Sequence, residues 1–110
     1  MMTIFEALAD PTRRRILDLL REQPRLVGEL VDLLETSQPG ISKHLRVLRD
    51  AGLVSVRKDG QRRWYELRPE ALAEVDGWLQ PYRHLWEARF DRLENLLDQL
   101  QEEEKNDGQT

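Results

Sequence analysis

Residues 37–54 read SQPGISKHLRVLRDAGLV, and this stretch decides how the rest of the chain is interpreted. The pair Pro39-Gly40 is a typical turn signal, but the residues after it repeat with helical spacing. If Ser37 is the N-cap, Pro39 falls in the first turn, where its missing N–H has no partner to lose. The stretch therefore predicts one helix over residues 38–51.

The predicted helix has an apolar side and a cationic side. Ile41, Leu45 and Leu48 fall within one narrow sector, as in a helix that packs on a core. The opposite side is polar and carries Gln38, Ser42, Lys43, Arg46 and Arg49. This is either a DNA-reading helix or an ordinary amphipathic helix with a basic outer face, and the neighbouring segments decide between the two.

The segments before this helix predict three more helices. A short one covers residues 3–8, and Asp10-Pro11 then combines an N-cap with a proline at the first helical position of a helix ending near residue 21. Residues 27–34 have apolar side chains at i, i+3, i+4 and i+7 and predict a further short helix. Three arginines at 13–15 lie where positive charge opposes the helix dipole, which allows a role toward phosphate or an acidic partner. Between this role and the alternative of solvated surface or intrachain salt bridges, we expect the alternative.

The period changes from helical to alternating after Gly52, a residue typical of a helix C-terminus. Residues 53–68 predict a two-stranded hairpin, or wing, with Asp59-Gly60 at its turn. The polar and basic residues near the tip of this wing are Arg57, Lys58, Gln61, Arg62 and Arg63.

Residues 69–103 predict C-terminal helices with a break or kink at Gln80-Pro81. Their large apolar residues follow a spacing close to a heptad seam, which is typical of a helix–helix interface. The seam consists of Leu79, Trp86, Phe90, Leu93, Leu97 and Leu100. Residues 104–110 are polar and predict a flexible tail.

The formal net charge of -4 conceals a strong sorting of charge along the chain. Residues 1–36 have a net charge of -2, residues 37–68 of +5 and residues 69–110 of -7. A basic middle between acidic flanks is a local electrostatic footprint, which matters more to a polyanionic partner than the total does.

Length and composition narrow the class of protein further. A chain of 110 residues is the length of one domain, mainly α with a small β-hairpin, and it contains no cysteine. No apolar run approaches the roughly 18–20 residues of a membrane span, and the first residues lack the order of a secretory signal. We therefore expect a cytoplasmic protein without a membrane partner. No catalytic motif is present, so we expect no enzyme activity and no cofactor.

The order of the predicted elements is typical of a winged helix-turn-helix. A major groove admits one α-helix, whose outer side chains near its N-terminus reach base edges and phosphates. On the helix we expect DNA contacts from Gln38, Pro39, Ser42, Lys43, Arg46 and Arg49. On the wing we expect backbone or minor-groove contacts from Arg57, Lys58, Gln61, Arg62 and Arg63.

Three segments, FEALADPTRRRILDLL, SQPGISKHLRVLRDAGLV and VRKDGQRRWYEL, resemble the ArsR/SmtB-type winged helix repressors. The resemblance covers nearly the whole chain from about Thr3. It implies a homodimer that binds an inverted-repeat operator in double-stranded DNA. It also implies a dimer interface built from the first and last helices, here with Ile4 and Phe5 on the first and the seam residues on the last.

The chain departs from the metal-sensing members of this family. Where those members place a Cys-x-Cys pair, this sequence has Leu26 and Gly28, which cannot ligate a metal. Its only two histidines, His44 and His84, are too few for the Asp/His sets found on the last helix of other members. The sequence instead resembles a metal-independent branch with a WL-PYR--WE-R segment at residues 78–89.

Two other functions stay open at this point. One is a repressor that responds to a small molecule bound between the dimer helices, near Trp78 and Trp86. The other is a winged helix that binds only protein. The sequence names neither an operator nor an effector.

Overall fold

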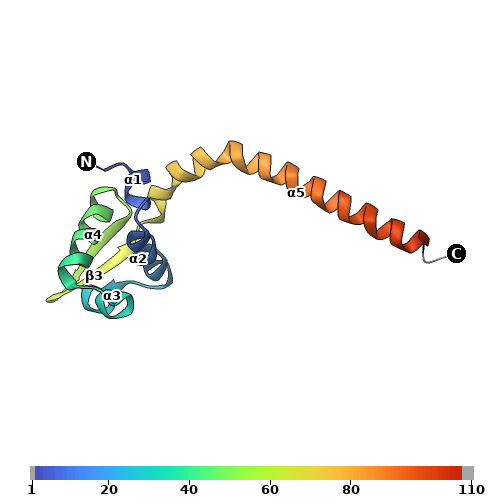
Figure 1. The fold of residues 1–110 in the computed structure, drawn as a ribbon. Coiled ribbons are helices and arrows are strands. Elements are labelled where there is room, and N and C mark those ends of the chain that lie inside the picture. The colour runs from blue at the N-terminus through green and yellow to red at the C-terminus, as the bar shows by residue number, and fades with distance from the viewer. Residues whose placement is uncertain (1, 108–110) are drawn as a thin grey trace. The chain divides into compact units, whose positions relative to one another are not determined.

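The computed structural model describes residues 2–107, and the colours of Figure 1 follow the order of its elements from the N-terminus to the C-terminus. The chain divides into two compact units, one ending at Val75 and the other beginning at Asp76. Because none of residues 76–105 is buried, the second unit has no core of its own.

The first two helices each begin after a capping side chain, and the cap of the second is the predicted one. Helix α1 (Ile4–Leu8) has Thr3 as its N-cap, and helix α2 (Pro11–Glu22) has Asp10. The Asp10 carboxylate accepts hydrogen bonds from the backbone N–H groups of Thr12 and Arg13, at 2.8 and 3.1 Å. These bonds satisfy donors that a helix N-terminus otherwise leaves unpaired.

The helix-turn-helix consists of α3 (Val27–Leu34) and α4 (Gln38–Asp50). Glu35 ends α3 in the left-handed conformation, with φ 52°. The Ser37 hydroxyl then caps α4 by accepting from the backbone N–H of Gly40 at 3.2 Å. The predicted helix over 38–51 is confirmed, with its last residue acting as the C-cap.

The predicted hairpin is also confirmed. Strands β2 (Val54–Asp59) and β3 (Arg62–Leu67) pair antiparallel over their whole length, with Gly60 in the turn at φ 62°. A third strand, β1 (Arg25–Leu26), pairs with β3 and gives the strand order β1-β3-β2. The sequence does not predict β1, because two residues are too few to show an alternating pattern.

The core of the first unit is formed by residues from all of its helices and from the hairpin. The buried side chains are Ile4, Ala7, Ile16, Leu17, Leu20, Leu30, Leu34, Ile41, Leu45, Leu48, Leu53, Val54 and Tyr65. The apolar side of α4 is therefore in the core, as predicted. This fixes which side of α4 faces solvent.

The position of Ile4 corrects one expectation from the sequence. The sequence places Ile4 at a dimer interface, but its side chain is only 6% exposed and packs in the core. The short helix α1 turns Ile4 and Ala7 inward, and Phe5 is its exposed large apolar side chain, at 39%.

The C-terminal segment differs from the prediction at both ends and in the middle. A 3-10 turn (Pro69–Leu72) precedes a single helix, α5 (Ala73–Asp107). Helix α5 runs through Pro81 without a break and continues past residue 103, where the sequence predicts a polar tail. Residues 108–110 of that predicted tail lie outside the described residues.

Side-chain contacts within α5 span Pro81. A proline removes one backbone hydrogen bond, but side chains on either side of it are linked. Asp76 forms an ion pair with Arg83, and the rings of Trp78 and Tyr82 lie 5.2 Å apart. These contacts join the turn before the proline to the turn after it.

Candidate nucleic-acid interface

The polar side of α4 is fully available to a partner. Six residues predicted to contact DNA are exposed: Gln38, Pro39, Ser42, Lys43, Arg46 and Arg49. Opposite them, Ile41, Leu45 and Leu48 are at most 1% exposed and hold the helix on the core. The helix thus presents its hydroxyl, amide and cationic side chains outward in one fixed orientation.

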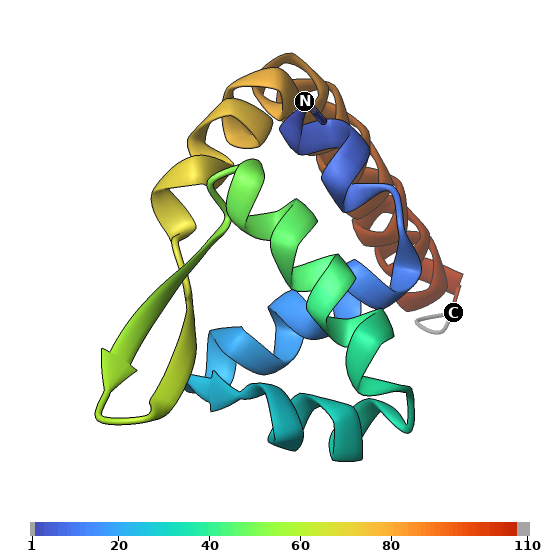
Figure 2. The same cartoon turned by 90° about the vertical axis from the view of Figure 1, so that its left-hand side faces the viewer.

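The wing carries the second group of predicted contacts. Figure 2 shows the β2–β3 hairpin projecting beyond the helices of the first unit. Its polar tip residues are all exposed: Arg57, Lys58, Gln61, Arg62 and Arg63. Arg57 has a partner in the hairpin itself, because its Nε donates to the Glu66 carboxylate at 2.7 Å. Part of its positive charge is therefore already balanced.

A groove joins the helix to the wing. It has a volume of about 370 Å³ and is lined by Ser42, Arg46, Arg49 and Asp50 of α4 and by Tyr65 of β3. Tyr65 is buried, so its ring is part of the core beneath the groove. Because two guanidinium groups and a hydroxyl line this depression, it suits an anionic group such as a phosphate better than an apolar one.

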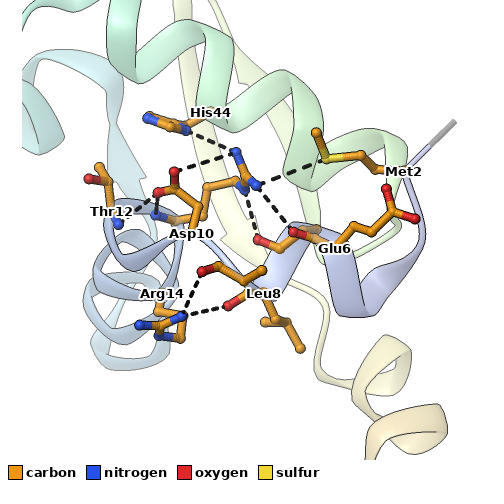
Figure 3. Close-up of polar contacts among 10 residues, drawn as sticks. Met2, Glu6, Leu8, Asp10, Thr12, Arg14 and His44 are labelled. Atoms are coloured by element: carbon orange, nitrogen blue, oxygen red, sulfur yellow. Dashed lines mark hydrogen bonds and ion pairs between the residues drawn. The ribbon is translucent and has the colours of Figure 1, made fainter.

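The arginine run at the start of α2 agrees with the expected solvated surface and intrachain salt bridges: Arg14 and Arg15 are exposed, and Arg13 forms an ion pair with Asp10 at 4.0 Å. The Arg13 side chain is 11% exposed, and its Nε donates to the Ala7 carbonyl at 2.7 Å. Its Nη2 donates to the Glu6 carbonyl at 3.2 Å, and its Nη1 lies 3.4 Å from Nδ1 of His44 on α4 (Figure 3). Arg14 donates to the carbonyls of Leu8 and Ala9 at 2.9 and 3.1 Å.

Sequence reasoning missed these contacts because they join residues that only the fold brings together. The one local signal is the short distance along the chain from the end of α1 to the arginines. Nothing in the pattern of α4 indicates that His44 meets Arg13.

The Asp10 carboxylate lies beside this arginine cluster. Its pKa lies below its ordinary value of 3.8, mainly because the backbone N–H of Arg13 donates a hydrogen bond to the ionised form. The charge of Asp10 therefore stabilises the start of α2 at neutral pH.

Comparison with known proteins gives the family. The family profile described as bacterial regulatory protein, arsR family, matches residues 10–56. The transcriptional repressor SdpR of Bacillus subtilis is 37% identical over 79 residues, which cover 72% of this chain and 88% of SdpR. The chain belongs to the ArsR family.

Two further proteins show how this ArsR-family chain relates to others. The arsenic resistance transcriptional regulator ArsR1 of Pseudomonas putida is 46% identical over 78 residues, covering 70% of this chain but 61% of ArsR1. The homodimeric winged helix-turn-helix DNA-binding domain Mb0332 of Mycobacterium bovis is 30% identical. It has a TM-score of 0.60 and covers 73% of this chain and 74% of that one.

Membership of the ArsR family confirms two predictions from the sequence. The fold is a winged helix-turn-helix, and the chain is a transcriptional repressor rather than an enzyme. Within residues 2–107, no helix is long and apolar enough to cross a membrane.

Proposed function

We propose that this ArsR-family repressor binds an inverted-repeat operator by inserting α4 into the major groove of each half-site. One observation carries the proposal: the exposed polar side of α4 continues through the Ser42–Arg46–Tyr65 groove onto the basic wing. Side chains near the N-terminus of α4 read base edges, and the wing contacts the flanking backbone. The protein then acts in the cytoplasm, in contact with DNA.

The proposed repressor is a homodimer. Helix α5 exposes large apolar side chains, among them Trp86, Phe90, Leu93, Leu97 and Leu100. Exposed apolar side chains gathered on one element are typical of a protein–protein interface. Phe5 of α1 adds to the proposed interface, and Leu79, at the start of the seam, is half-buried in the single chain. The homodimeric Mb0332 domain supports this assembly. A two-fold dimer would place its recognition helices about 34–36 Å apart, one turn of DNA.

We further propose that the repressor does not sense a metal. Leu26 and Gly28 stand where the resemblance places metal-binding cysteines, and neither side chain has a ligand atom. Within the part of the chain that the structure describes, no group of three His, Asp or Glu side chains could hold an ion. Metal-independence is a prediction that a binding assay with zinc or arsenite would test.

The decisive experiment removes two cations from α4. We expect Lys43→Ala/Arg46→Ala to weaken binding roughly 100-fold or more, because each contact to a base or phosphate contributes about 1–3 kcal/mol. The probe is a labelled duplex that the wild-type chain selects from random DNA, and binding is measured by fluorescence anisotropy. Affinity should also fall steeply with salt, since phosphate neutralisation releases counterions.

The control is Arg21→Ala, which removes one exposed cation at the end of α2. We expect this variant to bind the duplex like the wild type. A double variant that folds and still binds with wild-type affinity would refute the DNA-reading role of α4.

A further inference from the structure

Arg13 is a nearly buried cation with partners on two other helices. Its side chain is 11% exposed, and it donates to the carbonyls of Glu6 and Ala7 at the C-terminal end of α1. A helix leaves its last carbonyls without partners inside the helix, so these bonds attach Arg13 to the end of α1. The N-cap carboxylate of Asp10 lies 4.0 Å from the same guanidinium.

The same guanidinium also reaches the recognition helix. Its Nη1 lies 3.4 Å from Nδ1 of His44, which is half-buried on α4 beside Lys43 (Figure 3). A guanidinium group can only donate, so Nδ1 of His44 is the acceptor in this contact. The charged side chains that face His44 from the packed elements are Arg13 and Asp10.

We propose that Arg13 is a positioning residue for DNA binding, holding α4 in register with α1 through His44 without touching DNA itself. The proposal rests on the proposed function, in which α4 reads DNA and Phe5 of α1 contributes to the dimer contact. A displacement of α1 would then displace α4 through the contact of Arg13 with His44. Arg13 therefore links the state of the dimer interface to DNA affinity.

Substitution of Arg14 is the matched control, because it also removes hydrogen bonds from an arginine to backbone carbonyls at the end of α1. Arg14 donates two hydrogen bonds to the end of α1, at Leu8 and Ala9, and within residues 2–107 it makes no hydrogen bond or ion pair with α4. We expect Arg13→Met to weaken binding of the selected duplex about tenfold, as for loss of a charged hydrogen bond. Arg14→Met should bind within about twofold of the wild type. Equal losses in the two variants would overturn the proposal.

Substitutions of His44 test the link from the other side. His44→Asn keeps an acceptor close to the Nδ1 position and should bind the duplex nearly as well as wild type, whereas His44→Leu should lose about as much as Arg13→Met. The double variant Arg13→Met/His44→Leu should bind no worse than either single variant, because both changes remove one shared interaction. Losses that multiply would show that the residues act independently and would overturn the link. If Arg13→Met does not fold, His44→Leu tests the link alone: it should weaken binding about tenfold, and wild-type affinity would overturn the link.

A measurement without DNA separates this inference from the proposed function. Amide hydrogen exchange in α4 should be faster in Arg13→Met than in Arg14→Met at equal global stability. If the wild type binds no duplex, the proposed function fails, and faster exchange in α4 still supports the Arg13–His44 link. If DNA binding is normal and the two variants match in exchange and affinity, the link fails while the proposed function stands.

Discussion

Asp10 shows how much a single carboxylate contributes at the start of a helix. It accepts two backbone hydrogen bonds and faces the guanidinium of Arg13. Because its pKa is lower in the folded chain than in the unfolded chain, its charge stabilises the fold above its ordinary pKa of 3.8. That stabilisation is lost as the pH falls through the folded pKa.

The variant Asp10→Asn should therefore separate the charge from the cap. Asparagine keeps the cap acceptor, so we expect a loss of only about 0.3–1 kcal/mol at pH 7, the usual contribution of a charge at a helix N-terminus. The stability difference from wild type should shrink as the pH falls below 3.8. Urea denaturation at pH 7 and pH 3 measures it. A constant gap between Asp10→Asn and the wild type at the two pH values would contradict the assignment.

At the scale of residues, the sequence predicts caps well and long-range partners poorly. Asp10 and Ser37 act within their own turn, so the residues that follow them reveal their role. Arg13 acts on carbonyls of α1 and on His44 of α4, and those atoms meet it only after folding. Its position in the first turn of α2 is compatible with an intrachain salt bridge but does not indicate these partners on α1 and α4.

At the scale of elements, the end of α4 depends on one backbone conformation. Gly52 has φ +78°, and an added Cβ would meet no neighbouring atom. Gly28, in the first turn of α3, has equally open space and no positive φ. The two glycines therefore differ in backbone conformation and not in crowding.

Alanine at these two positions should shift stability in opposite directions. We expect Gly52→Ala to lower the free energy of unfolding by about 1 kcal/mol, because an L side chain is strained in the left-handed region. Gly28→Ala should raise it by roughly 0.4–1 kcal/mol by restricting the unfolded chain. The midpoints of urea unfolding measure both effects. A stabilising Gly52→Ala would show that the link from α4 to the wing does not need this conformation.

The elements that the sequence predicts correctly are those with apolar periodicity and capping or turn residues at their ends. Helices α3 and α4 have apolar periodicity and a clear beginning or end, so their bounds follow from local residues. Strand β1 is defined only by its pairing with Tyr65 and Trp64. Continuity of α5 across Pro81 could not be predicted, because a proline usually ends a helix.

At the scale of the whole molecule, the seam on α5 should determine the oligomeric state. The Phe90 side chain is 63% exposed in the single chain, and the proposed dimer would bury it. Phe90→Glu should give a monomer in sedimentation velocity at micromolar concentration, because burying an unpaired charge is costly. DNA affinity should fall with it, since two linked half-sites bind far more tightly than one.

Asn95→Glu is the corresponding control for this change. It adds the same charge to an exposed position of α5 that lies opposite the seam in a heptad, so it should leave the dimer intact. A Phe90→Glu variant that sediments as a dimer would show that α5 does not form the interface through this seam.

Charge sorting adds a constraint at the same scale. Helix α4 and the wing lie in residues 37–68, which have a net charge of +5. Residues 69–110 have a net charge of -7. DNA would attract the first segment and repel the second, so electrostatics alone favours one approach of the protein to a duplex. At high salt this preference should weaken together with the affinity.

The third strand of the sheet has a consequence for how this protein can diversify. Near Tyr65 the hairpin is three strands wide, because β1 pairs with β3 there, whereas toward Asp59 and Arg62 it is a two-stranded ribbon. Residues added or removed at the Gly60 turn would alter the ribbon and leave the three-stranded base in register. Wing length is thus a feature that evolution or an engineer can change without disturbing the helices, extending or shortening the stretch of operator that the protein covers.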